Sequence, residues 1–241
     1  MNKLFLKGVK HGLPIGLGYL SVSFAFGMQC VGGGLTVMQA LLISMTNLTS
    51  AGQLAGLQVM TAGSPLIEMA LTQFIINLRY ALMGLSLSQK LGPTMNTPRR
   101  MFFAFANTDE IFAVASSQPE KLHHHYLYGL MTMPYIGWSL GTFLGAAAGA
   151  VLPEFVNNAL GIAIYGMFIA IVIPPARKEK AVAVVALAAI AVSLIFNYLP
   201  VLSSVSGGFV VIICAVVAAT LGAILFPVKD EPAPANKEVE A

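Results

Sequence analysis

Arg79 is the residue whose chemistry most needs explaining, because it lies inside a long apolar stretch. It is the only charged residue between Glu68 and Lys90. An arginine at the centre of a transmembrane helix costs about 2.5–3.5 kcal/mol on insertion scales. It either faces the protein interior, where it binds a carboxylate or pairs with an acid, or extends its guanidinium to the lipid headgroups. Because intramembrane charges are rare, we expect the interior position, and we count nearby Asn77 among the candidate substrate-binding residues.

Asp109 and Glu110 are adjacent acids in a second apolar region. Adjacent side chains of a helix point about 100° apart, so the two carboxylates cannot face one partner. We expect one to pair with Arg79 and the other to carry a proton or to hold the start of a helix. The alternative is a first helical turn in a loop, where acids suit the helix dipole. Glu68, in the first turn after Pro65, is expected to have only such a structural role.

Two polar interruptions predict broken membrane segments. Ser50-x-x-Gln53 and Asn107-x-x-Glu110 both resemble capping boxes, the sequence sign of a helix start. A helix that starts at membrane depth belongs to a broken or re-entrant segment, which is tolerated only inside protein or beside a cavity. The helix start at Ser50 and Gln53 would present backbone N–H groups to the carboxylate of a small substrate. Alternatively, these polar side chains bond to neighbouring helices.

The composition requires a membrane protein. Of the 241 residues, 57% are hydrophobic and 10% are charged, whereas soluble domains contain roughly 25% charged residues. So few charges cannot cover a water-exposed surface, which excludes a soluble protein, a disordered protein and a nucleic-acid binder. The apolar runs are continuous rather than alternating, so we expect spanning helices and not the strands of a barrel.

Eight membrane segments would position the candidate residues, since a spanning helix needs about 20 residues. They cover residues 13–31, 36–60, 65–88, 101–118, 124–151, 157–175, 181–199 and 206–227. If the second and fourth segments re-enter on the side where they start, every Lys and Arg other than Arg79 falls in the cytoplasm. If all eight cross, Lys90, Arg99 and Arg100 move outside.

We therefore predict an all-α integral membrane protein, a polytopic helical bundle of about six full spans plus two broken or re-entrant segments. Both termini would lie in the cytoplasm. Residues 1–12 would form a cytoplasmic N-terminus, residues 13–227 a single transmembrane transporter domain, and residues 228–241 a disordered tail. Interrupted segments in both halves of a chain, entering from opposite faces, are the sequence pattern of a transporter binding site. No residue repeat relates the halves, so inverted symmetry is a hypothesis.

Glycine ladders predict where helices approach each other closely. Glycine recurs every four residues at Gly8, Gly12 and Gly16, and again at Gly137, Gly141, Gly145 and Gly149. Helix packing is the expected role of both ladders, and a moving seam between helix bundles is the functional alternative.

Several absences limit the function. The sequence has no GxxxxGK[ST], GxSxG or HExxH motif, so nothing argues for an enzyme or a cofactor. Consecutive histidines at positions 123–125 suggest a metal, but consecutive side chains on a helix diverge and no Cys or acid cluster completes a site. We expect a wet cytoplasmic loop there and no metal.

Four short motifs, taken in order, resemble the AzlC family, the large subunit of two-component branched-chain amino acid exporters. They are Gly12-Leu13-Pro14-Ile15, Ala51-Gly52-Gln53, Asn77-Leu78-Arg79 and Thr108-Asp109-Glu110. The resemblance covers about residues 8–227. The position after Arg79 is often His in the family, and here it is Tyr80.

The resemblance implies a secondary transporter that exports leucine, isoleucine and valine, with methionine as a further candidate. It also implies a small, separately encoded AzlD-like membrane partner and a place in the prokaryotic cytoplasmic (inner) membrane. The substrate-binding residues would be Ser50, Gln53, Asn77, Arg79, Asp109 and Glu110, with a proton as a candidate coupling ion. Two other functions stay open: a permease subunit energised by a separate ATPase, and a non-transporting membrane scaffold.

Overall fold

The computed structural model describes residues 3–149, 151, 166, 169, 172–202 and 204–227. The regular elements among these residues are all helices, and the only β-pairing there is an isolated bridge between Leu91 and Leu122. Four of the described helices are long and apolar enough to cross a membrane. They are α1 (Lys3–Gly32), α4 (Leu66–Ser88), α9 (Lys180–Tyr198) and α10 (Gly207–Leu225). The prediction of an all-helical membrane protein is confirmed.

The remaining helices include the shorter members of two broken segments. The first broken segment contains α2 (Val37–Thr46) and α3 (Ser50–Thr61), and the second contains α5 (Thr97–Ala104) and α6 (Asp109–Ser116). Two further elements are α7 (His124–Gly149) and the 3-10 helix η1 (Pro200–Leu202). The chain starts α1 at Lys3, so most of the predicted N-terminal extension 1–12 belongs to this helix. The predicted segment 157–175 lies largely outside the described residues, and the predicted tail 228–241 lies wholly outside them.

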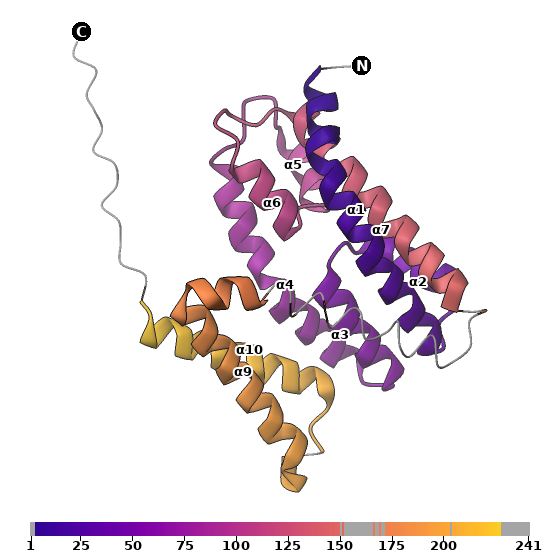
Figure 1. Cartoon of the computed structure of the whole chain (residues 1–241), viewed down its shortest axis with the longest axis vertical. Coiled ribbons are helices and arrows are strands. Elements are labelled where there is room, and N and C mark those ends of the chain that lie inside the picture. Colours follow the sequence, from indigo (N-terminus) through magenta and orange to yellow (C-terminus); the bar gives the residue numbers. More distant parts are fainter. Residues whose placement is uncertain are drawn as a thin grey trace.

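Helices α1 and α7 run side by side in the same direction and form the spine of the bundle (Figure 1). Their glycine ladders face each other along the whole contact. A Cβ at Gly8 would overlap backbone atoms of Tyr126, and one at Gly145 would overlap backbone atoms of Phe24. The prediction that these glycines permit close helix approach is therefore confirmed.

Both broken segments are helical hairpins that return to the end of the bundle where they start. The first hairpin, α2 and α3, begins just after α1, and its far end at Thr61 lies beside Gly33 at the end of α1. The second, α5 and α6, begins after Thr94, whose hydroxyl accepts a hydrogen bond from the His124 N–H at 3.4 Å. It ends near Gln118, whose carbonyl accepts from Lys90 Nζ at 2.7 Å. This geometry agrees with the re-entrant version of the predicted topology.

Helix α4 connects the two hairpins and runs in the opposite direction to α1. It starts near the end of α1, and the chain that follows it pairs with Leu122, just before α7. The chain thus forms a long helix followed by a hairpin twice, first as α1 with α2 and α3, then as α4 with α5 and α6. The long helices of the two units run in opposite directions. This is the relation that the inverted-symmetry hypothesis expects at the level of helix direction.

The helix starts within both breaks lie one residue from the predicted capping boxes. In the first break the N-cap is Thr49 and not Ser50. It makes no side-chain cap bond, and its hydroxyl donates to Asn77 Oδ1 at 2.8 Å. In the second, the N-cap is Thr108 and not Asn107, and its hydroxyl accepts from the Ile111 N–H. The predicted helix starts are right, whereas the predicted capping residues are wrong.

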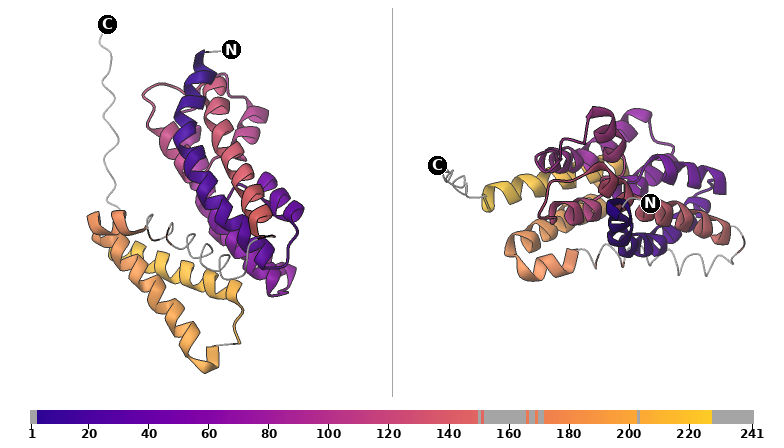
Figure 2. Two further views of the ribbon diagram at one scale, coloured as in Figure 1. Left: turned by 45° about the vertical axis from the view of Figure 1, so that its right-hand side comes forward. Right: turned by 90° about the horizontal axis from the view of Figure 1, so that it is seen from above.

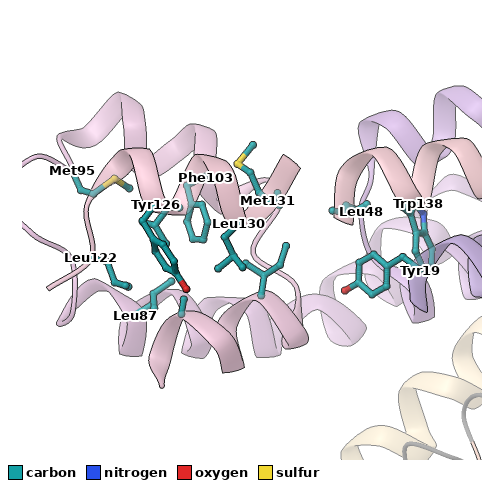
Figure 3. Close-up of a cluster of buried hydrophobic side chains, with 14 residues drawn as sticks. Tyr19, Leu48, Leu87, Met95, Phe103, Leu122, Tyr126, Leu130, Met131 and Trp138 are labelled. Atoms are coloured by element: carbon teal, nitrogen blue, oxygen red, sulfur yellow. The ribbon is translucent and has the colours of Figure 1, made fainter. Parts of the chain in front are cut away.

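The hydrophobic core runs along α7 and reaches both breaks (Figure 3). Tyr126 and Leu130 pack with Phe103 of α5 near one end, and Tyr19 packs edge-on against Trp138 at a centroid distance of 5.2 Å. Leu48, in the first break, is buried in the same cluster. The core therefore holds both breaks against the spine. Helices α9 and α10 lie at the opposite end of the bundle from the N-terminus (Figure 2).

Candidate functional site

The two breaks face each other across a pocket. It has about 440 Å³ of empty space, including the part that opens outward. The first break contributes Thr46, Asn47, Leu48 and Thr49, the second contributes Ala104, Phe105 and Asn107, and α4 contributes Asn77 and Tyr80. Segments far apart in the sequence therefore meet at one point, where the helical backbone is interrupted on both sides.

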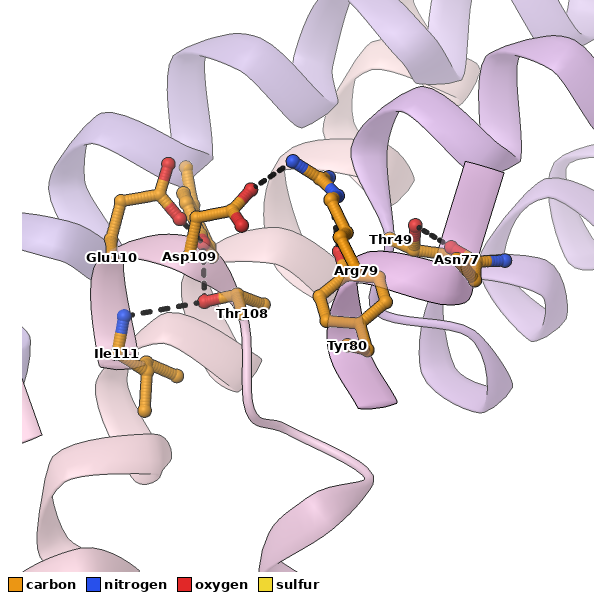
Figure 4. Close-up of polar contacts among 9 residues, drawn as sticks. Thr49, Asn77, Arg79, Tyr80, Thr108, Asp109, Glu110 and Ile111 are labelled. Atoms are coloured by element: carbon orange, nitrogen blue, oxygen red, sulfur yellow. Dashed lines mark hydrogen bonds and ion pairs between the residues drawn. The ribbon is translucent and has the colours of Figure 1, made fainter. Parts of the chain in front are cut away.

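Arg79 and Asp109 form an ion pair beside this pocket, with 2.5 Å between Nη1 and Oδ2 (Figure 4). The guanidinium also donates to the Tyr80 hydroxyl at 3.3 Å and lies over the Tyr80 ring. The predicted partner of Arg79 is thus present. Tyr80 fills the position where the family often has His, and it orients the arginine.

Glu110 turns away from Arg79 and binds Tyr19 of α1, as the divergence of adjacent acids requires. The Tyr19 hydroxyl contacts both the Glu110 carboxylate and Thr108 Oγ1, the latter at 2.7 Å. Tyr19 is therefore a site residue that sequence reasoning missed. In the sequence, Tyr19 is only a tyrosine within an apolar helix, and nothing distinguishes it from an ordinary buried tyrosine.

A chain of hydrogen bonds fixes Asn77 and joins α3 to α4. Asn77 accepts from the Thr49 hydroxyl and donates to Gln73 Oε1 at 3.1 Å, and Gln73 Nε2 donates to the carbonyl of Gly52 at 2.7 Å. These bonds hold the start of α3 at a fixed height along α4. Asn77 also lines the pocket, which is where we expect a substrate-binding residue to lie.

Ser50 and Gln53 separate in the structure. Ser50 lines a smaller cavity together with Asp109, Glu110 and Tyr19. Gln53 is buried elsewhere and donates to Ser44 Oγ at 3.0 Å, and that oxygen lies 2.7 Å from Thr142 Oγ1. Gln53 thus joins α3 to α2 and α7, as the alternative of interhelical bonding expects, and lies outside the linings of both cavities.

The start of α3 has an uncompensated positive dipole end. Its N-cap forms no side-chain cap bond, and its first turn contains no acid. Helix α6, by contrast, begins with Asp109 and Glu110, which suit its own dipole. The dipole of α3 would therefore stabilise a negative group next to Ser50, just as the dipole of α6 stabilises Asp109 and Glu110.

The Arg79–Asp109 pair is only partly covered by the chain. The side chains are 42% and 46% exposed, respectively. Lipid tails cannot solvate charges, so water or another protein must cover this face of the bundle in a membrane.

The three consecutive histidines converge, contrary to the prediction that they diverge. Their ring centroids lie 4.0 to 4.9 Å apart, His123 stacks on both of the others, and their potential ligand atoms lie within 4.8 Å of one another. His123 precedes α7, and its Nδ1 accepts from the His125 N–H at 3.2 Å, which explains why its ring folds back. Desolvation lowers the pKa of His123, and the charges of His125 and Arg99 lower it further.

Two opposed helical hairpins whose breaks meet beside an ion pair define a class: polytopic helical membrane proteins with interrupted segments, a pattern that marks the binding sites of transporters. The chain belongs to the AzlC family, since the family model described as "AzlC protein" matches residues 14–152. That range includes all six predicted substrate-binding residues. The AzlC family is a membrane transport family and not an enzyme family, so this chain is a membrane protein with a role in transport.

Curated relatives support this assignment. The chain is 27% identical to the inner membrane protein YgaZ of Escherichia coli over 76% of its own length and 77% of the relative's. It is 30% identical to an uncharacterized membrane protein of Archaeoglobus fulgidus over 80% of its own length and 85% of the relative's. A membrane protein of Helicobacter pylori is 25% identical over 68% of this chain and 75% of the relative. No solved structure gives a significant match.

Proposed function

We propose that this protein exports branched-chain amino acids (leucine, isoleucine, valine and also methionine) as the large subunit of a two-component secondary transporter. The observation that carries the proposal is the Arg79–Asp109 ion pair beside the opposed breaks. A zwitterionic amino acid has one charge to match each member of this pair. The family resemblance supplies the choice of branched-chain substrates.

The substrate carboxylate would bind Arg79 and the uncapped start of α3 near Ser50. Both are positive, and backbone N–H groups at a helix start suit a carboxylate. The ammonium group would bind Asp109, which exchanges its partner Arg79 for the substrate. Such an exchange leaves neither charge of the partly exposed pair without a partner at any stage, which limits the cost of removing water from them.

The aliphatic side chain would lie in the pocket between the breaks. Leu48, Ala104 and Phe105 give that pocket an apolar wall, while Asn77 and Tyr80 separate it from the charged groups. Small differences in an apolar pocket discriminate weakly, by about 1–3 kcal/mol per methylene group. The proposed site therefore accepts several aliphatic amino acids, in agreement with a group of substrates.

Alternating access would arise from the opposed hairpins. Each hairpin closes the site from one end of the bundle, and Tyr19 links the second hairpin to α1 through Glu110. Glu110, which has no basic partner among the described residues, is the candidate for proton coupling. Protonation of Glu110 would weaken its bond to Tyr19 and free α6.

A small AzlD-like membrane subunit would cover the exposed face of α4. Phe74, Leu78, Leu82 and Leu85 are exposed on this helix near the partly exposed Arg79. A protein partner could offer polar groups to the ion pair, which lipid cannot. The complex would lie in the prokaryotic cytoplasmic membrane with both termini in the cytoplasm.

Leucine efflux tests the proposal directly. Cells loaded with a leucine-containing dipeptide would express the chain with and without its small partner. We expect faster efflux only with both subunits, and loss of that efflux in Arg79→Ala. The matched control is Arg99→Ala, which removes an arginine from α5 outside the pocket. Wild-type efflux by Arg79→Ala, with normal insertion, would remove Arg79 from the site.

A further inference from the structure

Three consecutive imidazole rings, those of His123, His124 and His125, form a histidine cluster at the start of α7. Their potential ligand atoms lie within 4.8 Å of one another, and the Nδ1 atoms of His123 and His125 are 3.2 Å apart. Two nitrogens bound to one tetrahedral Zn²⁺ ion, each about 2.0–2.1 Å from it, are roughly 3.3 Å apart. The closest pair of the cluster therefore already has the spacing of two ligands of one ion.

The local backbone explains why these side chains converge. Within a helix each residue turns about 100° from the one before it, but α7 begins only at His124, so His123 does not follow this rule. The His123 ring folds back along the chain, where its Nδ1 accepts from the His125 N–H at 3.2 Å. The His124 N–H donates sideways to Thr94 Oγ1 at 3.4 Å. The expectation of no metal rested on divergent side chains, and this geometry removes that reason.

His124 supplies an independent sign of a ligand. Its Nδ1 atom is shielded from solvent and has no hydrogen-bond partner in the part of the chain that the structure describes. A buried polar atom without a partner costs stability, and such atoms are rare in folded proteins. The Nδ1 atom of a neutral imidazole is a common metal ligand. An ion held between the three rings would give this nitrogen a partner.

The surroundings give an ion a route to the histidine cluster. His123 and Glu120 line a cavity with about 580 Å³ of empty space, including the part that opens outward. Glu120 therefore brings a carboxylate and water to the same side of the cluster. Lys121 and Arg99 are the opposing charges, but each donates to a backbone carbonyl at 2.7 Å, which directs both cations away from the rings.

We propose that His123, His124 and His125 form a binding site for one divalent transition metal ion such as Zn²⁺. Imidazole nitrogens suit Zn²⁺, Cu²⁺ and Ni²⁺, whereas Mg²⁺ and Ca²⁺ prefer oxygen ligands. The histidines supply three nitrogens, and water or the Glu120 carboxylate supplies the fourth ligand. Binding replaces the hydrogen bond from the His125 N–H to His123, and the partly exposed rings rotate toward a common centre. The ion then fixes the connection between α6 and α7.

Zinc titration of the full chain, with any polyhistidine tag removed, tests the proposal. Isothermal titration calorimetry in detergent at about pH 7.5, above the ordinary pKa of imidazole, should give one Zn²⁺ per chain with micromolar affinity. Mg²⁺ should not bind. The triple variant His123→Gln, His124→Gln, His125→Gln should lose the Zn²⁺ site. The control His11→Gln removes the remaining histidine of the chain, whose Nδ1 lies 2.9 Å from the Tyr126 hydroxyl, and should bind as the wild type does.

X-ray absorption at the zinc edge gives a second test that needs no variant. The wild-type chain with bound Zn²⁺ should show three imidazole ligands at about 2.0–2.1 Å and no sulfur ligand. The proposal is overturned if the wild type does not bind Zn²⁺ at micromolar concentrations, or if the triple variant binds it equally well. If the triple variant fails to insert, a spectrum with fewer imidazoles or with a sulfur ligand overturns it. Absence of leucine efflux would refute the substrate assignment and leave this result standing.

Discussion

Arg79 and Asp109 show why an ion pair in a membrane segment is more than an attraction between two charges. Each member removes the cost of leaving the other unpaired, so a single substitution exposes an uncompensated charge. Because the pair is partly exposed, its strength depends on what covers that face of the bundle. Structural and substrate-binding roles therefore need a variant that separates them.

Exchange of the two charges separates these roles. The double variant Arg79→Asp with Asp109→Arg keeps an ion pair between α4 and α6 but reverses it relative to the start of α3. We expect normal insertion and thermal stability, together with efflux reduced more than tenfold. Membrane abundance, thermal unfolding in detergent and leucine efflux would be measured side by side. Recovery of wild-type efflux in the double variant would assign the pair a structural role only.

Tyr19→Phe tests the link between α1 and the second hairpin. The substitution keeps the ring that packs on Trp138 and removes the hydroxyl that contacts Glu110 and Thr108. Loss of a hydrogen bond to a charged group costs about 1.5–3 kcal/mol, so the free energy of unfolding should fall by that order. The control is Tyr198→Phe at an exposed position near the end of α9. Equal stability of the two variants would argue against the link.

At the scale of elements, the seam between α1 and α7 depends on the absence of side chains. Gly145→Ala places a methyl group against backbone atoms of Phe24, which cannot move aside as a flexible side chain can. We expect destabilisation of about 1–3 kcal/mol, the usual cost of overpacking. Gly18→Ala, on the partner helix α1 but with open space around its Cβ position, should have little effect. Thermal unfolding of both variants checks the contrast.

The opposed hairpins predict a definite labelling pattern. With both native cysteines replaced, single cysteines would be introduced at Gly63, between α3 and α4, and at Arg99 in α5. Because the two positions lie at opposite ends of the bundle, we expect Gly63→Cys to be labelled from outside and Arg99→Cys only after the membrane is made permeable. Labelling of Arg99→Cys from outside would show that the segments cross fully.

The positions of most helices and of both breaks could be predicted from the sequence, because hydropathy and interrupted apolar runs are local signals. The helix starts near Ser50 and Asp109 followed from such signals, and so did the close approach of the glycine ladders. The partners of Glu68 and Tyr19 could not be predicted, since 140 and 91 residues, respectively, separate them from Gly208 and Glu110. The sequence left the direction of Gln53 open, because a polar side chain at a helix start can face either the site or a neighbouring helix.

At the scale of the whole molecule, the energy source is the property that most clearly distinguishes a secondary exporter from an ATP-driven permease. The proton-coupled secondary exporter proposed above uses the proton gradient, whereas a permease with a separate ATPase uses ATP. We expect collapse of the proton gradient to stop leucine efflux at once in cells that still contain ATP. Efflux that continues until ATP is exhausted would favour the ATP-driven complex. Substrate-dependent thermal stabilisation of the purified subunits would argue against a scaffold without transport activity.

The pairing of α1 with α7 also sets the order in which the chain can be assembled. Gly8 finds its partner near Gly129, and synthesis at about 5–20 residues per second separates the two by on the order of ten seconds. During that time the first helix sits in the membrane with its glycine face uncovered, while two hairpins and α4 are made. Helix α1 thus reaches its contact with α7 only after the helices from α2 to α6 have been made. A membrane chaperone or the insertion machinery would have to shield it until α7 arrives.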